Sequence, residues 1–121
     1  MQINLIDESF RHLVNDEGKY SMVHNKRPKN ITWVRDRLNY EGITIFTDSH
    51  LNINSINAVK STIKIGWFLE NRNVVPGAYF NVDSYIHELD FILTNDIELL
   101  ARYPEKAKFV PFGGGWVRQE N

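Results

Sequence analysis

Polar, charged or glycine-rich positions follow each apolar stretch that the sequence offers as a β-strand. Ligands of open α/β sheets bind beyond the carboxyl ends of the strands, because loops and helix N-termini converge there. We therefore expect the functional surface in these loops. The strand-end positions are Asp7-Glu8, Asp48-Ser49-His50, Glu70-Asn71-Arg72, Thr94-Asn95-Asp96 and Gly113 to Gly115. The predicted substrate-binding residues are Asp48, His50, Asn71, Arg72, Asn95 and Asp96.

Glu70 is the strongest candidate for chemistry because it directly follows the largely apolar run 63–69. Its backbone is anchored by that run, while its side chain is free to face a partly dry cleft. A carboxylate in such a place can act as a general base toward a hydroxyl nucleophile. The structural alternative is an ion pair with Arg72, two residues later. For Asn95 and Asp96 the structural alternative is helix capping.

Metal and dinucleotide chemistry receive little support. The four histidines share no metal-ligand spacing, and the absence of cysteine excludes disulfides, thiolate nucleophiles and Cys-ligated metals. The glycine run 113–115 follows the last predicted strand, and no helix follows it to receive a phosphate, so we interpret it as a hinge or linker. We therefore expect this domain to hold no metal and no cofactor.

Composition bounds the remaining possibilities. With 121 residues, of which 42% are hydrophobic, the chain fits one domain with one core. Its net charge is −1 and its basic residues are scattered, which argues against a nucleic-acid partner. No apolar run approaches the ~20 residues of a membrane span, and the N-terminus lacks the pattern of a signal peptide. These features predict a cytoplasmic protein, and a homo-oligomer stays open.

Strand-like and helix-like stretches alternate along the chain. Five strands are expected, and the alternation predicts an α/β fold with an open, mainly parallel Rossmann-like sheet and helices on both faces. The strands should begin near Ile3, Ile43, Ile63, Phe91 and Lys108. The helices should cover residues 30–39, capped by Asn30, then 52–62, the stretch from Pro76 to Leu89, and 96–102, where Asn95 and Glu98 would form a capping box.

Residues 1–115 are assigned to this domain, and residues 116–121 to the start of a linker or tail. The segment from Asp7 to Asn30 is mostly polar and has little apolar surface to offset the entropy of ordering. We expect it to be the most mobile or irregular part, unless a partner chain orders it.

Three segments of the chain resemble a known enzyme group. They are the run from Lys64 to Glu70 with Pro76 and Tyr79 after it, the run from Leu89 to Asp96, and the run from Lys108 to Gly114. Together they resemble the N-terminal half of GT-B-type glycosyltransferases, most closely the fucosyltransferase-like proteins of bacteria and phages. In that family an apolar strand ends in a glutamate, a proline follows, and a helix leads to a strand of the type seen at 89–96.

The resemblance implies a glycosyltransferase-like domain that contributes the acceptor side of the cleft, with a carbohydrate acceptor as substrate and Glu70 as general base. The nucleotide-sugar donor would bind mainly a second domain after Gly115 or a partner chain, so this chain alone should be inactive. Two alternatives stay open. One is a stand-alone Rossmann-type module that binds a nucleotide or sugar phosphate without catalysis, and the other is an interaction domain whose loop after residue 69 binds another protein.

Overall fold

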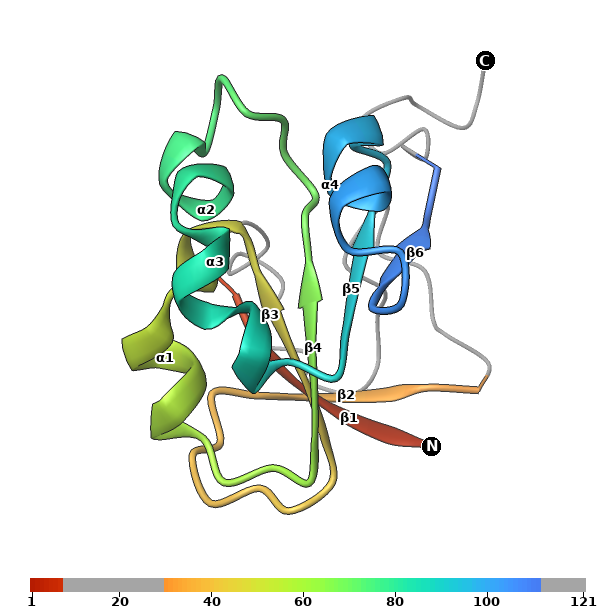
Figure 1. Cartoon of the computed structure of the whole chain (residues 1–121). Helices are drawn as coiled ribbons and strands as arrows, with labels where there is room; N and C mark the ends of the chain where they lie inside the picture. The colour runs from red at the N-terminus through yellow and green to blue at the C-terminus, as the bar shows by residue number, and fades with distance from the viewer. Residues whose placement is uncertain (8–29, 112–121) are drawn as a thin grey trace.

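The computed structural model describes residues 1–7 and 30–111, which contain one open sheet of six parallel strands. The strand order is β2-β1-β3-β4-β5-β6 (Figure 1). The strands are β1 (Gln2–Ile6), β2 (Thr32–Arg35), β3 (Ile43–Thr47), β4 (Ile63–Trp67), β5 (Phe91–Thr94) and β6 (Ala107–Phe109). The helices are η2 (Asp48–His50), α1 (Ile53–Ala58), α2 (Pro76–Phe80), α3 (Val82–Tyr85), η3 (Ile86–Glu88) and α4 (Ile97–Arg102).

The predicted fold class is confirmed, and all five predicted strands are present. Their β-branched and apolar residues suit strands that pack on both sides, as parallel strands do. β6 forms the edge of the sheet and ends at Phe109, two residues before Pro111, which has no N–H to donate. The prediction of an irregular segment between Asp7 and Asn30 concerns residues 8–29, which lie outside the described residues, as does the predicted hinge at 113–115.

The predicted helix at 30–39 is wrong, because this segment forms the sixth strand, β2. Thr32 to Arg35 pair in register with Gln2 to Leu5 of β1. Trp33 and Val34 are both buried, which suits successive strand residues on opposite faces of a sheet. Asp36 then adopts a positive φ of 54°, which no right-handed helix contains. The helical spacing of three apolar residues was outweighed by the β propensity of Thr32, Trp33 and Val34.

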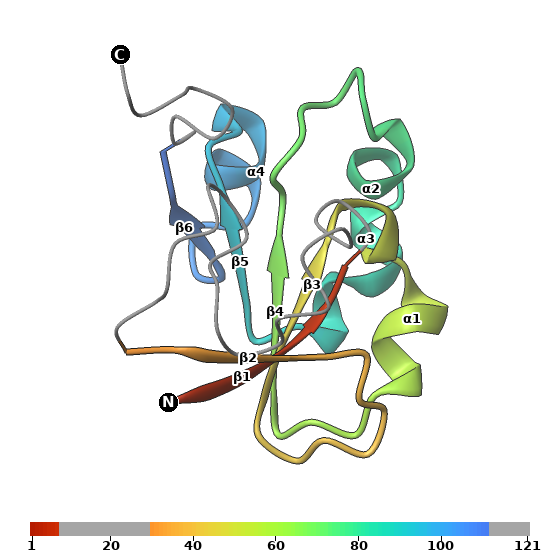
Figure 2. The same ribbon diagram turned by 180° about the vertical axis from the view of Figure 1, so that it is seen from behind.

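The strand order places a change of direction between β1 and β3. From β1 the chain proceeds to β2 on one side, and then to β3 on the other side of β1. Such a switch point is where open α/β sheets commonly bind ligands, outside the carboxyl ends of the strands. Figure 2 shows β1 and β2 from the side opposite the helices.

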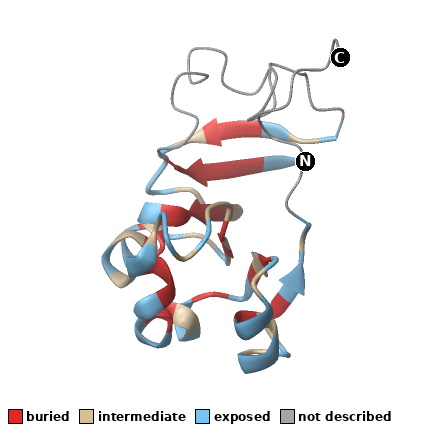
Figure 3. Ribbon diagram, turned by 90° about the horizontal axis from the view of Figure 1, so that it is seen from above, coloured by how far each residue is buried: buried red, intermediate tan, exposed pale blue. Residues whose placement is uncertain are grey.

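The two faces of the sheet are covered differently. Every described α-helix contributes to a single core with one face of the sheet, and the helices lie together on that side in Figure 3. On the other face Ile3, Leu5, Trp33 and Ile45 form a second cluster, built from strand residues. Helices were expected on both faces; the described part of the chain shows them on one, in part because residues 30–39 form a strand.

Gly66 lets the helix-covered face pack closely against the centre of β4. A Cβ at this position would lie 2.7 Å from Leu51 Cδ2 and 2.9 Å from Leu89 Cδ1. Since real Cβ atoms do not approach other atoms so closely, only glycine fits here without a shift of both leucines. The sequence therefore keeps the turn before α1 tight against the sheet, beside the strand that leads to Glu70.

Candidate functional site at the carboxyl ends of the strands

Parallel strands place all their carboxyl ends at one edge of the sheet, so the loops after them gather there. Five carboxylate residues follow five different strands at this edge: Asp7 after β1, Asp36 after β2, Asp48 after β3, Glu70 after β4 and Asp96 after β5. Their contacts differ, and the contacts decide what each carboxylate can do.

Asp7 is committed to a buried ion pair. Its Oδ2 lies 2.7 Å from Nη1 of Arg35, at the end of β2, and both side chains are almost inaccessible. The Thr47 hydroxyl donates a hydrogen bond to Asp7 Oδ1 at 3.3 Å. These contacts tie the ends of β1, β2 and β3 together, which is a structural role.

Asp48 is committed to backbone amides. Only 3% of the residue is exposed, and its Oδ1 accepts hydrogen bonds from the N–H groups of Leu69 at 2.9 Å and Glu70 at 3.0 Å. Its φ of 42° lies in the left-handed region, which Asp tolerates better than most residues. The residue therefore fixes the end of β4 to the end of β3, and its carboxylate is used in doing so.

Glu70 is fixed through its backbone, and its carboxylate is left available. Its N–H donates to Asp48, and its carbonyl oxygen accepts a hydrogen bond from the Tyr79 hydroxyl at 2.6 Å. The residue is half-buried, and its carboxylate has no hydrogen-bond or ion-pair partner among the described residues. The structure thus places Glu70 at the predicted edge with partial access, and the alternative ion pair with Arg72 is absent from this part of the chain.

Arg72 pairs with Asp96 instead. Arg72 Nε lies 2.9 Å from Oδ1 and Nη2 lies 2.8 Å from Oδ2, a bidentate pair, and Glu98 Oε2 lies 3.0 Å from the same Nη2. The hydrogen bond from Arg72 is the main cause that lowers the pKa of Asp96, and it likewise raises the pKa of Arg72. The guanidinium carbon also lies 4.8 Å from the centre of the Tyr79 ring. Arg72 therefore clamps the loop after β4 to the start of α4.

The capping box predicted with Asn95 and Glu98 is wrong in its residues. Asp96 is the N-cap of α4, and its Oδ2 accepts from the Leu99 N–H at 2.9 Å. Asn95 is exposed, and Glu98 contacts Arg72 rather than reaching back to the cap. Asp96 takes the N-cap position in place of Asn95 because its carboxylate accepts hydrogen bonds from the Arg72 guanidinium and from the helix N-terminus at once.

The remaining predicted binding residues are Asn71 and His50. Asn71 Oδ1 accepts hydrogen bonds from the N–H groups of Asn73 at 2.9 Å and Val74 at 3.2 Å, so its side chain shapes the turn after β4. His50 is half-buried at the end of η2. The Asn71 side chain makes no hydrogen bond to Glu70 among the described residues.

Tyr79 contacts Glu70, a role that the sequence analysis did not predict when it placed Tyr79 on an apolar helix face. Its ring is buried, with 4% of the residue exposed, and it packs 4.9 Å from the ring of Phe68. Burial raises the pKa of its hydroxyl to about 12. Its spacing from Val82 and Tyr85 indicated the helix face correctly, but no local pattern reveals that the hydroxyl reaches the carbonyl of Glu70.

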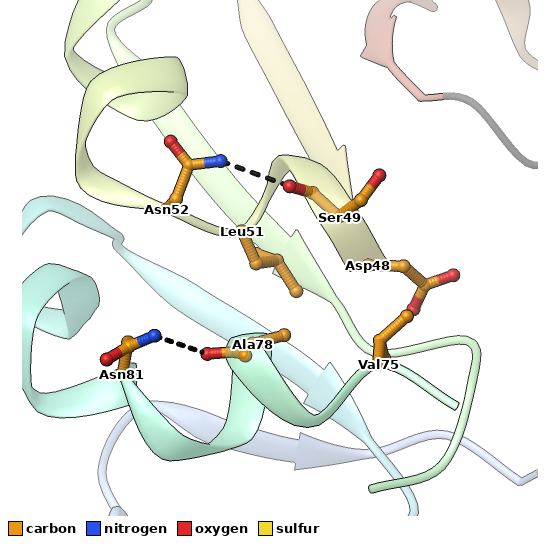
Figure 4. Close-up of a pocket in the computed structure, with 8 residues that line it drawn as sticks. Asp48, Ser49, Leu51, Asn52, Val75, Ala78 and Asn81 are labelled. Carbon is orange, nitrogen blue, oxygen red and sulfur yellow. Dashed lines mark hydrogen bonds between the residues drawn. The ribbon is translucent and has the colours of Figure 1, made fainter. Parts of the chain in front are cut away.

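A pocket of about 310 Å³ lies beside this edge, between the turn that links η2 to α1 and the helix α2 (Figure 4). The Asn52 side chain donates to the Ser49 carbonyl, and the Asn81 side chain donates to the Gly77 carbonyl, both at 3.0 Å. Because Asp48 belongs to the lining and also binds the Glu70 amide, the pocket adjoins the backbone of Glu70. Its lining residues are Asp48, Ser49, Leu51, Asn52, Val75, Gly77, Ala78 and Asn81.

Within residues 1–7 and 30–111, no three or more His, Asp or Glu side chains are grouped so that they could hold a metal ion. In the same residues, no helix has the length and hydrophobicity needed to cross a membrane. Comparison with known proteins found no matching family model, curated protein or solved structure.

Proposed function

We propose that this chain is the acceptor-side domain of a sugar-transferring enzyme in which Glu70 is the general base. The observation that carries the proposal is the difference among the five strand-end carboxylates. Asp7 is paired with Arg35, Asp48 with two amides and Asp96 with Arg72 and a helix cap. Asp36, after β2, also has an interaction of its own. Only Glu70 combines a fixed backbone with a carboxylate left without a partner among the described residues.

The resemblance to fucosyltransferase-like proteins supports the same residue by a separate route, since Glu70 matches the glutamate that ends the apolar strand in that family. In the proposed reaction the Glu70 carboxylate takes the proton of an acceptor hydroxyl. The hydroxyl oxygen then attacks the anomeric carbon of the donor sugar, and the bond from that carbon to the nucleotide phosphate breaks. The nucleoside diphosphate leaves, and the configuration at the anomeric carbon is inverted.

In this proposal the donor nucleotide sugar binds mainly to a second domain or a partner chain, and the carbohydrate acceptor binds to the domain described above. Fixation of the base matters because a general base must hold its oxygen within about 3 Å of the hydroxyl oxygen whose proton it takes. The two hydrogen bonds on the Glu70 peptide groups provide that fixation without engaging the carboxylate.

Charge at the edge favours this function over the alternative of a module that binds a nucleotide or sugar phosphate. The opposite charges cancel within the ion pairs Asp7–Arg35 and Asp96–Arg72, while Glu98 and Glu70 add negative charge to this edge. A phosphate would meet repulsion there, whereas an uncharged hydroxyl-bearing acceptor would not. A cytoplasmic location and the absence of a nucleic-acid partner stay predictions from the sequence.

The test is a transfer assay on the full-length gene product, or on this chain mixed with a separately produced donor-binding domain. The assay measures release of nucleoside diphosphate from GDP-fucose, UDP-glucose or UDP-galactose in the presence of acceptor glycosides. Glu70→Gln should lower kcat by about 100-fold or more, the usual scale for loss of a general base, while donor binding changes little.

Glu105→Gln is the matched control, because Glu105 is an exposed glutamate in the turn before β6, at the opposite edge of the sheet. It removes the same charge without touching the proposed site. Equal kcat for the Glu70→Gln and Glu105→Gln variants would show that Glu70 is not the base. Binding of GDP or a sugar phosphate to this chain, with no transfer under any condition, would support the binding-module alternative instead.

A further inference from the structure

The pocket between η2, α1 and α2 has a lining whose chemistry limits what it can bind. No Lys, Arg or His belongs to the lining, so no cation is present to hold a phosphate or carboxylate. The single carboxylate, that of Asp48, already accepts two backbone hydrogen bonds. An anionic ligand would therefore lose its hydration without gaining a charged partner, and a neutral ligand is favoured.

The rest of the lining is divided between apolar and neutral polar groups. Leu51, Val75 and Ala78 supply the apolar part. Asn81 uses its Nδ2 on the Gly77 carbonyl, and its Oδ1 has no hydrogen-bond partner within the described part of the chain. The Ser49 hydroxyl has none there either. These two oxygens are placed to bind hydroxyl groups, while the apolar groups suit the C–H face of a sugar ring.

Size and surroundings agree with this chemistry. Pockets for small ligands begin at roughly 300 Å³, so a volume of about 310 Å³ suits one monosaccharide unit rather than a nucleotide sugar. Phe80 on α2 is 86% exposed and stands three residues after the lining residue Gly77, which places the two on adjacent parts of the helix surface. An exposed aromatic ring close to the pocket is a further surface on which a sugar ring can pack.

We propose that this pocket binds a neutral monosaccharide unit of the acceptor and so holds the acceptor beside Glu70. The proposal rests on the proposed function, because it assigns the acceptor to this particular pocket. The link to the base runs through Asp48, which belongs to the lining and whose carboxylate binds the Glu70 N–H. A sugar in the pocket would therefore lie against the same turn that fixes the base.

The test measures binding, without any transfer activity, by NMR titration of the 121-residue chain. The probes are the methyl glycosides of fucose, galactose and glucose, with glucose 1-phosphate and GDP as anionic comparisons. At least one methyl glycoside should bind with a Kd near the millimolar range, at about 1–10 mM, and shift the amide signals of Ser49, Gly77 and Asn81. The two anions should not shift these signals.

Gly77 offers a matched pair of variants. A Cβ at Gly77 meets no atom closer than Asn81 Nδ2 at 3.9 Å, so a side chain fits there without a backbone clash. Gly77→Leu should fill the pocket and weaken glycoside binding by about tenfold or more, while Gly77→Ala should change it by less than about twofold. Leucine and alanine both favour a helix over glycine, so neither variant should lower the melting temperature.

Asn81→Ala provides a second readout in case the leucine disturbs α2, and it should also weaken binding because it removes an acceptor oxygen. The proposal is overturned if no methyl glycoside shifts these signals at about 20 mM, if only the phosphate compounds do, or if Gly77→Leu leaves binding unchanged. Glu70→Gln separates the two proposals: it should leave glycoside binding intact while lowering transfer. If Glu70→Gln loses transfer activity but no methyl glycoside binds to the chain, the proposal for the pocket is rejected and the proposal for Glu70 as general base is supported.

Discussion

The ends of β3 and β4 carry one carboxylate each, yet the two carboxylates have opposite situations. Asp48 is buried and accepts two hydrogen bonds from the amides of the next strand end. The N–H of Glu70 donates one of those hydrogen bonds. Glu70 is half-buried, and its carboxylate has no partner among the described residues. The Asp48 side chain stabilises this edge of the sheet, and the Glu70 carboxylate stays available there. Position at a strand end thus predicts where a functional residue can lie, and the partners of each side chain distinguish a supporting carboxylate from an available one.

The largest expected effect comes from removing the supporting carboxylate. Asp48→Ala leaves the amides of Leu69 and Glu70 without their acceptor and places alanine at a φ of 42°. Unsatisfied buried donors and a strained backbone should together lower the free energy of unfolding by about 2–4 kcal/mol. Urea unfolding followed by circular dichroism would measure it. A decrease in the free energy of unfolding of less than about 0.5 kcal/mol would contradict the supporting role of Asp48.

A smaller effect is expected on the other side of Glu70, from Tyr79→Phe. This change removes the hydrogen bond to the Glu70 carbonyl and should cost about 0.5–1.5 kcal/mol at neutral pH. The pKa of the Tyr79 hydroxyl is about 12 in the folded protein, against 10.0 ordinarily. The unfolded chain therefore releases this proton first, and the wild type loses stability as the pH rises from 10 toward 12.

The stability gap between wild type and Tyr79→Phe should consequently stay constant below about pH 9 and narrow above about pH 10. Urea midpoints at several alkaline pH values would show it. A stability gap that stays constant up to pH 11 would contradict the raised pKa of Tyr79 in the folded protein. Either way, the activity of the variant reports whether fixing the Glu70 carbonyl matters for turnover.

The sequence was sufficient for the parts of this architecture that local patterns encode. The β-branched run at 43–47 and the apolar run at 63–67 predicted two strands, and their polar successors predicted the edge. The sequence does not predict β2, because Ile31, Val34 and Leu38 have helical spacing, and the pairing of this segment with β1 depends on residues distant in the sequence.

The candidate site was predictable to the same degree. Glu70 was placed correctly because its position depends on its own strand. The bond from Asp48 to the amides at 69 and 70 joins residues 21 and 22 positions apart, and Asn52 and Asn81 line the pocket from two different elements. Arrangements of this kind depend on strand order and helix packing, which local spacing in the sequence does not encode.

A third, smaller effect is expected at the clamp beside Glu70. Asp96→Asn keeps a good N-cap but loses the charge that pairs with Arg72. The pair is partly exposed, so the loss at pH 7 should be about 0.5–1 kcal/mol. The Arg72 hydrogen bond lowers the pKa of Asp96 below its ordinary 3.8, so this stability is present above about pH 4 and disappears as the pH falls through the depressed pKa.

Urea unfolding of wild type and Asp96→Asn at pH 7, 4 and 2.5 would test this prediction. The gap should shrink toward the lowest pH. A gap that grows on acidification would contradict the sign of the shift, and Asp83→Asn, at an exposed carboxylate that contacts Arg102 instead, serves as the comparison.

The smallest expected effect on stability belongs to Glu70 itself, and it is the sharpest test of the comparison. The Glu70→Gln substitution is nearly isosteric, and it leaves both backbone hydrogen bonds of the residue in place. Because the carboxylate has no partner among the described residues, the change should alter the free energy of unfolding by less than about 0.5 kcal/mol. A residue that supports the fold would not behave in this way, as Asp48→Ala should demonstrate in the same experiment. If Glu70→Gln instead destabilises the protein by more than about 1 kcal/mol, its carboxylate has a structural partner, and a loss of transfer in that variant would no longer identify a base. A neutral effect on stability together with a fall in kcat of about 100-fold would leave proton transfer as the role of this side chain.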